Sequence, residues 1–489
     1  MKAKNIGLIL GPLLFFIILK YFHPEGLSKE ANSILACTLW IAVWWITEAI
    51  PIAITALLPM VLFPLSGGLD LPTTSSAFGH KYIFLYMGGF IIAIAIEKWN
   101  LHKRIALNII NIIGSDVRKI ILGFMIATAF LSMWISNTAT SVMMLPIGLA
   151  IISQLQDNPS TIENENLIFG KALMLSIAYS ASIGGIATLI GTPPNLVLAG
   201  VILDNYNYEI TFMQWFTFGL PISILLLFIC WKYLTVYTFK FQQTEFPGGK
   251  KEIKRLLKEL GKISFEEKLV AIVFFLTAFC WVTRSFLLQK ILPNIDDTII
   301  AMFFSILLFL LPSKQKKGAL IYWKDAVKMP WDVILLFGGG MALAKAFDDS
   351  GLALWIGSQA NLLMGLQLFL LIFVLITAVN FLTEITSNLA TTAMLLPILA
   401  PIALTLDIHP FMLMVSTALA ASCAFMLPVA TPPNAVVFGS GYLKISDMVR
   451  KGIIMNVISI VLLSLFVFFI LPYFWDLIAD QFPDQFRID

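Results

Sequence analysis

Two polar stretches interrupt segments that are otherwise apolar enough to lie in lipid. SNTATSVMMLPI spans residues 136–147 and SNLATTAMLLPI spans residues 387–398, with eight of the twelve positions identical. Their serine, threonine and asparagine side chains supply neutral oxygens, which are suitable ligands for a hard cation. Small polar residues also form hydrogen bonds between membrane helices. Because the whole pattern occurs twice, we favour a binding site over helix packing alone.

A second pair of elements follows the polar stretches. GTPPNLVLAG spans residues 191–200 and ATPPNAVVFG spans residues 430–439. Two consecutive prolines remove two backbone donors and disfavour helix in the preceding residue, so each element predicts a helix break. A break frees carbonyl oxygens for a cation such as sodium, and it exposes the N-terminus of a half-helix near Asn195 or Asn434. Since a helix N-terminus favours anions, one site can hold cations and an anion without a basic side chain.

The order of these elements indicates an internal repeat. LYMGGFIIAIAIEKWNL (residues 85–101) precedes the first pair, and LLFGGGMALAKAFDDSGL (residues 335–352) precedes the second. Five spans are expected between the polar stretches, at residues 168–203, 211–239, 266–289, 298–312 and 331–356. An odd number of crossings gives the repeats inverted topology, which is typical of secondary transporters.

The apolar runs around the polar stretches have an unusual length. The first run, between Arg118-Lys119 and the polar residues 154–166, is about 34 residues long, whereas one span needs about 20. The second run, residues 366–405, has similar proportions. These lengths predict two re-entrant hairpins, the first with Ser136-Asn137-Thr138 at its tip. We expect the hairpins to enter from opposite faces, so that their tips meet near the midplane.

The composition indicates a membrane protein. Of 489 residues, 59% are hydrophobic and 12% are charged, whereas soluble proteins carry roughly 25% charged residues. Apolar segments such as residues 222–237 and 453–470 are too long for the strands of a transmembrane barrel. The sequence therefore predicts an all-α polytopic membrane protein.

The basic residues predict the orientation of the chain, because loops rich in lysine and arginine face the cytoplasm. They form four groups: Lys98, Lys103, Arg104, Arg118 and Lys119; Lys250, Lys251, Lys254, Arg255, Lys258, Lys262 and Lys268; Lys314, Lys316, Lys317, Lys324 and Lys328; and Lys444, Arg450 and Lys451. We expect a plasma (inner) membrane location, a cytoplasmic N-terminus and an extracytoplasmic tail at residues 476–489. Residues 248–268 alternate lysine with glutamate and predict an amphipathic surface helix; we expect no nucleic-acid partner.

The SN tips, the paired TPPN breaks and WWITEAIPI at residues 44–52 resemble the divalent-anion/sodium symporter family. That family contains sodium-coupled carriers of dicarboxylates, citrate and sulfate. The resemblance implies a homodimer whose protomers have about eleven spans and two re-entrant hairpins, with a scaffold and a transport domain that moves as an elevator. The division that we expect is residues 1–113 (mainly scaffold), 114–210 (first hairpin and broken helix, transport), 211–330 (linking spans and Lys-rich loop, mainly scaffold), 331–363 (Gly-rich span), 364–445 (second hairpin and broken helix, transport) and 446–489 (last span and tail).

The resemblance also implies the ligands. It assigns one sodium site to Ser132, Ser136, Asn137 and the Gly191 carbonyl, and a second to Thr383, Thr386, Ser387, Asn388 and the Ala430 carbonyl. It assigns the substrate carboxylates to Ser136, Asn137, Thr138, Thr192, Pro193, Ser387, Asn388, Leu389, Thr431 and Pro432. At the position of Leu389 many family members have threonine, so this chain lacks one hydroxyl donor. The identity of the anion is therefore open.

Two carboxylates, Glu48 and Glu384, lie in or beside apolar spans, where charge is costly. They are either ligands for a proton or cation, or packing residues that accept hydrogen bonds from backbone or hydroxyl groups. We favour the packing interpretation, because the hairpin tips already supply ligands.

Residues and resemblance together predict import of C4-dicarboxylates such as succinate, malate or fumarate, coupled to two or more sodium ions and without an organic cofactor. Citrate or sulfate transport, and sodium-independent dicarboxylate exchange, are the alternatives. An integral-membrane enzyme needs a nucleophile with a partnered base or a metal cluster, and the spans contain no such motif, so we do not expect an enzyme. Inverted repeats favour alternating access over a channel.

Overall fold

The computed structural model describes residues 3–114, 116–155, 164–241, 247–315 and 318–487. Within these ranges the chain is almost entirely helical, and the only strands are a short antiparallel pair, β1 (Pro312–Ser313) and β2 (Gly318–Ala319). Lys316 and Lys317 of the third basic group lie outside the described residues. The prediction of an all-α protein is confirmed.

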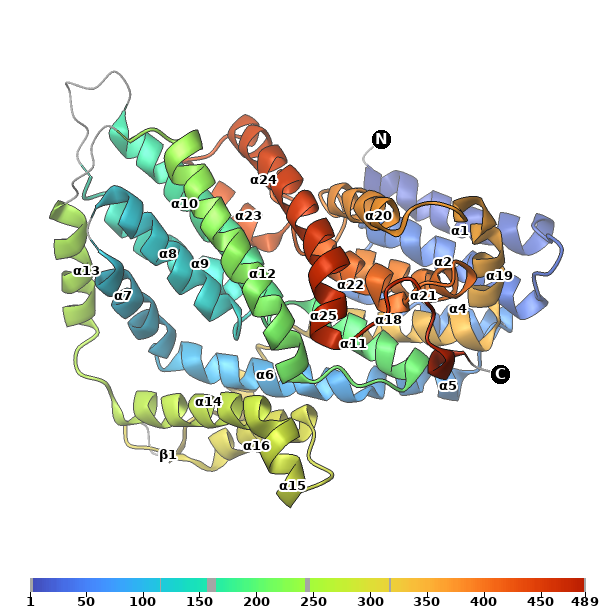
Figure 1. Cartoon of the computed structure of the whole chain (residues 1–489). Coiled ribbons are helices and arrows are strands. Elements are labelled where there is room, and N and C mark those ends of the chain that lie inside the picture. Colours follow the sequence, from blue (N-terminus) through green and yellow to red (C-terminus); the bar gives the residue numbers. More distant parts are fainter. Residues whose placement is uncertain (1–2, 115, 156–163, 242–246, 316–317, 488–489) are drawn as a thin grey trace.

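The N-terminal part starts with two closely packed helices at one end of the molecule (Figure 1). Close packing depends on small residues, since a Cβ atom at Gly11 would lie only 2.7 Å from the Trp40 ring. The elements of this part are α1 (Ala3–Tyr21), α2 (Lys29–Thr47), α3 (Ile52–Thr55), α4 (Pro59–Ser66), α5 (Leu71–Ser76), η1 (Ala77–Gly79), α6 (Lys81–Lys98) and α7 (Leu101–Ile113).

Two helical hairpins and two broken helices are present where the sequence predicts them. The first repeat contains the hairpin α8 (Val117–Ser132) and α9 (Asn137–Ile152), and the broken helix α10 (Glu165–Ile186) and α11 (Pro193–Tyr206). The second contains the hairpin α20 (Leu368–Leu382) and α21 (Asn388–Thr405), and the broken helix α22 (Pro410–Ala421) and α23 (Pro432–Phe438). Each proline pair occupies the first turn of its half-helix, where a missing N–H removes no intrahelical bond.

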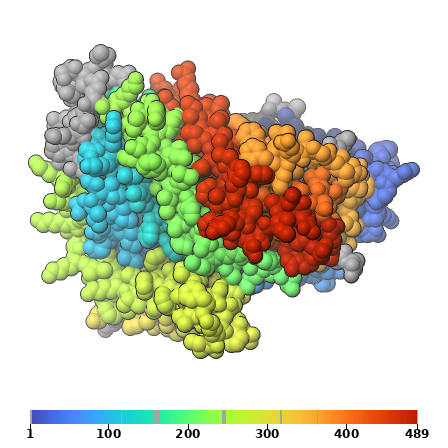
Figure 2. Space-filling model, in the orientation of Figure 1, coloured from blue at the N-terminus to red at the C-terminus, as the bar shows by residue number. Residues whose placement is uncertain are grey.

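The remaining helices link the repeats or follow them. The linking elements are α12 (Phe212–Lys232), η2 (Tyr233–Thr238), α13 (Pro247–Glu259), α14 (Phe265–Thr283), η3 (Arg284–Leu288), α15 (Gln289–Ile291), α16 (Asp297–Leu310), α17 (Trp323–Ala326), α18 (Trp331–Asp349), α19 (Leu352–Gln359) and η4 (Ala360–Leu363). The last elements are α24 (Ile445–Leu465), η5 (Phe466–Ile470), α25 (Leu471–Trp475) and η6 (Asp484–Phe486). In Figure 2 the C-terminal segment (red) crosses one face between the first-half helices in green and the second-half helices in orange. Helix α13 carries the first part of the Lys-rich segment, which confirms the predicted amphipathic helix as far as Glu259. The prediction of one helix over residues 248–268 is wrong beyond that point, because residues 260–264 are not helical and α14 begins at Phe265.

The described helices suit a membrane. Seven of them are long and apolar enough to cross one, and five further apolar helices are shorter. The shorter group includes α9, α20 and α22, which belong to hairpins or broken helices. The number of membrane spans therefore cannot be obtained from helix length alone. Large apolar side chains such as Phe303 and Ile306 of α16 are exposed on the surface, as lipid contact requires.

The two repeats interlock. Helix α9 packs against α23 of the other repeat, and α21 packs against α11. The ring of Tyr179 in α10 contacts that of Phe425 in the second helix break, with the ring centres 5.0 Å apart. The second arm of each hairpin therefore lies against the half-helix of the opposite repeat, and the polar elements of both repeats share one packed interior.

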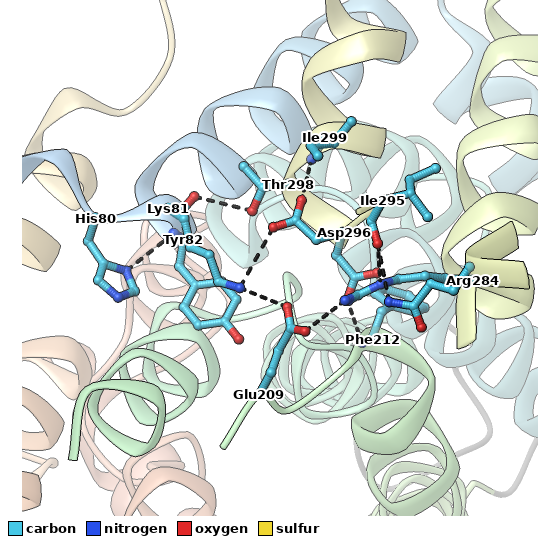
Figure 3. A network of polar contacts seen from close by, with 12 residues as sticks. His80, Lys81, Tyr82, Glu209, Phe212, Arg284, Ile295, Asp296, Thr298 and Ile299 are labelled. Carbon is cyan, nitrogen blue, oxygen red and sulfur yellow. Dashed lines mark hydrogen bonds and ion pairs between the residues drawn. The ribbon is translucent and has the colours of Figure 1, made fainter. Parts of the chain in front are cut away.

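A partly buried ionic network ties the α11–α12 connection to its neighbours. Glu209 lies between Lys81 of α6 and Arg284 of η3, at 2.8 and 2.7 Å from their side-chain nitrogens (Figure 3). Arg284 is buried and also lies 3.1 Å from Asp297 of α16. Lys81 lies 3.7 Å from Asp296 as well. The network joins residues that are remote in sequence, and no local pattern predicts it.

Candidate functional site

At the first hairpin tip, hydroxyl, amide and carbonyl oxygens come together. Helix α8 ends at Ser132, and its Oγ donates to Asn137 Oδ1 at 2.5 Å and to the Ala181 carbonyl of α10 at 2.7 Å. One hydroxyl proton serves both acceptors, so three oxygens are gathered around a single hydrogen. Ser136 is the N-cap of α9, and its Oγ accepts from the Ala139 N–H at 3.2 Å. Asn137 is therefore the first helical residue of α9, directly after the tip turn.

The second tip repeats this arrangement with threonine in place of serine. Thr383 Oγ1 donates to Asn388 Oδ1 at 2.7 Å and to the Ala421 carbonyl of α22 at 3.2 Å. Ser387 caps α21 without a hydrogen bond from its side chain to the helix, unlike Ser136. Its hydroxyl is therefore not committed to capping.

Three predicted tip residues differ from this symmetry. Thr138 is exposed, whereas Leu389, its counterpart in the second repeat, is buried. Thr386 Oγ1 lies 2.6 Å from Thr391 Oγ1 and donates to the Leu382 carbonyl at 2.9 Å, so its hydroxyl is already engaged within the hairpin.

The first helix break spans residues 187–192 and is fixed by side chains. Asn195 Nδ2 donates to the carbonyls of Thr188 (2.9 Å) and Gly185 (3.3 Å). Thr188 Oγ1 donates to the Met133 carbonyl in the hairpin tip at 2.5 Å, which joins the break to the tip. Thr192 is buried and extended, as the following proline requires.

Gly185 shows how closely the break and the tip approach. A Cβ atom built there would lie 2.7 Å from Asn137 Oδ1 and 3.1 Å from the Gly191 carbonyl oxygen. The structure therefore brings Ser132, Asn137 and Gly191 of the predicted first sodium set together.

The second break spans residues 422–431 and has the same design. Asn434 Nδ2 donates to the carbonyls of Leu427 (2.9 Å) and Ala424 (3.4 Å). Thr431 caps α23, with its Oγ1 accepting from the Asn434 N–H at 3.3 Å. Ala430 lies within this break and donates its N–H to the Leu427 carbonyl at 3.2 Å. Thr383 and Asn388 of the second sodium set are therefore in contact, while Ala430 belongs to the neighbouring break.

The two break asparagines have a role that the sequence analysis did not assign. Both are fully buried, and among the described residues neither Asn195 Oδ1 nor Asn434 Oδ1 has a hydrogen-bond donor. The sequence signal that could have indicated this role is the asparagine that ends both TPPN elements. The amides hold the freed carbonyls in place, and one unpaired amide oxygen lies inside each break.

Glu384 is a packing carboxylate, as we predicted. It is buried, and its Oε1 accepts from the N–H groups of Phe425 (2.9 Å) and Met426 (3.0 Å) and from Asn456 Nδ2 (2.7 Å). Its Oε2 accepts from the Leu427 N–H at 2.9 Å. Glu384 thus holds the start of the second break, the part that also supplies the carbonyls for Asn434.

The same interpretation is wrong for Glu48. This residue is exposed and ends α2 in a left-handed backbone conformation with φ of 46°. Its carboxylate faces the surface, so it is not a buried packing group.

Known proteins with similar sequences are membrane transporters. The sequence profile described as “Sodium:sulfate symporter transmembrane region” matches residues 2–479. “Sodium-dependent dicarboxylate transporter SdcS” of Staphylococcus aureus (strain USA300) is 50% identical over 476 residues, covering 96% of this chain and 92% of that protein. The protein of the same name from Staphylococcus saprophyticus is 49% identical over 480 residues, with the same coverage of 96% and 92%.

Two solved structures share the fold at low sequence identity. Neisseria gonorrhoeae MtrF has a TM-score of 0.58 and 14% identity, with 96% of each chain covered. The Alcanivorax borkumensis YdaH transporter has a TM-score of 0.57 and 13% identity, with 97% of each chain covered. At such identities the likeness concerns the fold alone.

Proposed function

Because this chain belongs to the sodium:sulfate symporter family, we propose that it imports C4-dicarboxylates such as succinate, malate and fumarate together with sodium ions. The observation that carries this proposal is the duplicated set of oxygens at Ser132–Asn137 and Thr383–Asn388, each next to a broken helix. The names of the relatives, which are half identical over nearly the whole chain, support sodium and a dicarboxylate as the transported species.

The proposed sodium ligands are neutral oxygens. Ser132, Ser136, Asn137 and the Gly191 carbonyl form the first set; Thr383, Thr386, Ser387, Asn388 and the Ala430 carbonyl form the second. A sodium ion at the first set would take the place of the hydrogen bond from Ser132 to Asn137. The Ser132 hydroxyl keeps its proton, which remains hydrogen-bonded to the Ala181 carbonyl, and the oxygens of Ser132 and Asn137 turn lone pairs toward the ion.

The proposed anion site uses backbone dipoles and the bound sodium ions. The carboxylates of the substrate would contact the tips at Ser136-Asn137-Thr138 and Ser387-Asn388 and the breaks at Thr192-Pro193 and Thr431-Pro432. Helices α9, α11 and α21 each begin at one of these elements, and their N-termini favour negative charge. Leu389 offers no hydroxyl, which leaves one carboxylate oxygen to other donors or water.

We propose the elevator arrangement for the movement. Residues 114–210 and 364–445 move, and residues 1–113 and 211–330 form most of the scaffold of a homodimer in the plasma (inner) membrane, with residues 331–363 and 446–489 completing the chain. Moving a dianion against a negative interior with net positive charge requires more than two sodium ions per cycle. In the orientation that the basic loops favour, the N-terminus lies in the cytoplasm and the C-terminal tail lies outside.

Uptake of labelled succinate into proteoliposomes tests the proposal. Replacing external sodium by choline should abolish uptake, and unlabelled malate and fumarate should compete better than citrate or sulfate. Proteoliposomes carrying a variant with both Asn137→Ala and Asn388→Ala provide the inactive control. Full uptake in choline would reject sodium coupling, and stronger competition by citrate or sulfate would reject a C4-dicarboxylate as the substrate.

A further inference from the structure

A polar cavity lies away from the hairpin tips, where α6 ends. It has a volume of about 330 Å³ and is lined by Lys98, Tyr322, Lys324, Asp325 and Lys328. The lining combines three cations, one anion and an aromatic ring. Neither the proposed sodium sites nor the proposed substrate site uses any of these residues.

The charges of this cavity are not balanced. Lys98 Nζ lies 2.6 Å from Asp325 Oδ2 and donates to the Leu320 carbonyl at 2.9 Å, so this lysine is held in place and its charge is neutralised. Burial raises the pKa of Asp325. The hydrogen bonds from Lys98 and the Tyr322 N–H, together with the charge of Lys328, outweigh burial, so the net pKa lies below the ordinary aspartate value and the carboxylate stays ionised. Lys324 and Lys328, four positions apart in the chain, are the exposed lysines of the lining. The cavity therefore has an excess of positive charge on its exposed side.

Exposed aromatic and apolar side chains alternate with these lysines along the chain. Trp323 is 65% exposed, Val327 45% and Trp331 41%, and Leu310 at the end of α16 is 73% exposed. Leu310 is close to the cavity, because the Leu320 N–H donates to the carbonyl of its neighbour Leu311. Exposed tryptophans beside lysines are typical of the membrane–water interface. The basic group that contains Lys324 and Lys328 belongs to the side that we expect to face the cytoplasm.

We propose that this cavity binds the phosphate group of an anionic phospholipid from the cytoplasmic leaflet. Lys324 and Lys328 contact the phosphate oxygens, while Trp323 and Trp331 contact the glycerol and the start of the acyl chains. A basic pocket at the end of transmembrane helices suits an anionic lipid head group. A free anion would use the two lysines but would gain nothing from the exposed tryptophans. This site is independent of the proposed transport function.

Native mass spectrometry of the full-length protein, titrated with phosphatidylglycerol or phosphatidylcholine, tests the proposal. The double variant K324Q/K328Q should bind phosphatidylglycerol roughly 30-fold more weakly, since each lysine near an anionic lipid contributes about 1 kcal/mol. The matched control K254Q/K258Q removes two exposed lysines with the same spacing from α13 and should bind as the unchanged protein does.

The two sources of phosphate are separated by further measurements. Inorganic phosphate at millimolar concentration should not displace the lipid, and Trp323→Ala should weaken lipid binding. Equal loss of lipid in both lysine double variants overturns the proposal in favour of general surface charge. Displacement by inorganic phosphate, with Trp323→Ala having no effect, overturns it in favour of a free-anion site.

Discussion

Replacing Glu384 by glutamine should damage the second helix break and lower the apparent affinity for sodium. The carboxylate accepts hydrogen bonds from three consecutive backbone N–H groups, at residues 425–427, and from Asn456. A glutamine has only one acceptor oxygen. If that oxygen keeps the partners of Oε1, its amide NH₂ faces the Leu427 N–H, and two donors oppose each other.

The magnitude follows from these contacts. Leaving the Leu427 N–H unpaired costs about 1–3 kcal/mol, and exchanging a charged for a neutral acceptor weakens each of the other three bonds by about 1 kcal/mol. Glutamine also removes the cost of burying a charge, which offsets several kcal/mol of this loss. The gross loss is about 4–6 kcal/mol. With an offset of about 3 kcal/mol we expect a net loss of about 1–3 kcal/mol, located in the break that carries Ala430 and Thr431.

Two assays on Glu384→Gln check this reasoning: thermal unfolding in detergent, and succinate uptake at increasing sodium concentration. Unfolding should occur at a lower temperature, and uptake should need more sodium to reach half its maximum. Glu48→Gln makes the same chemical change on the surface and should alter neither measurement. Unchanged stability and sodium dependence in Glu384→Gln would show that the carboxylate does not support the break.

Three further predictions follow from the site and its surroundings. Asn137→Ala and Asn388→Ala should each abolish uptake with little change in expression, whereas Asn108→Ala on the exposed face of α7 should transport normally; retained activity in both tip variants would remove the site assignment. Gly185→Ala should impair sodium-dependent uptake, because the added Cβ would lie 2.7 Å from Asn137 Oδ1. Gly89→Ala should be active, because its Cβ would meet only Ile190 at an ordinary contact distance of 3.8 Å. Equal activity of the two variants would contradict the crowding argument. Glu209→Gln should lower the free energy of unfolding by about 1–3 kcal/mol, because it leaves Asp297 as the one carboxylate that neutralises Arg284 among the described residues. Burial raises the pKa of Glu209, but Arg284 and Lys81 outweigh burial, so the net pKa lies below the ordinary glutamate value. The stabilisation is therefore present above the ordinary glutamate range and is lost as pH falls through the lowered pKa. Acid unfolding curves that coincide for the variant and the unchanged protein would refute this prediction.

Local chemistry explains why much of the site was predictable from the sequence. Two adjacent prolines break a helix wherever they lie, so the breaks before Pro193 and Pro432 follow from those residues alone. The tip contacts Ser132–Asn137 and Thr383–Asn388 join residues five positions apart across one turn. The family resemblance indicated these pairs, and their short separation along the chain explains why the side chains meet.

The contacts of Glu384 and Glu48 show where this reasoning stops. Both residues follow a threonine at the end of an apolar segment, and the sequence suggested the same packing role for both. Only the packing of α20 against α22 and α24 gives Glu384 its partners, 41 to 72 residues away, while Glu48 ends α2 at the surface.

The sequence by itself determined the helical membrane class, the two repeats and the positions of the hairpin turns and helix breaks, because composition, apolar length and proline chemistry act over short distances along the chain. Only the tertiary structure decided that α9 lies against α23 and α11 against α21, which carbonyls the break asparagines hold, and that Glu209 joins Lys81 to Arg284. These contacts unite residues far apart in the chain, and they depend on how whole helices pack.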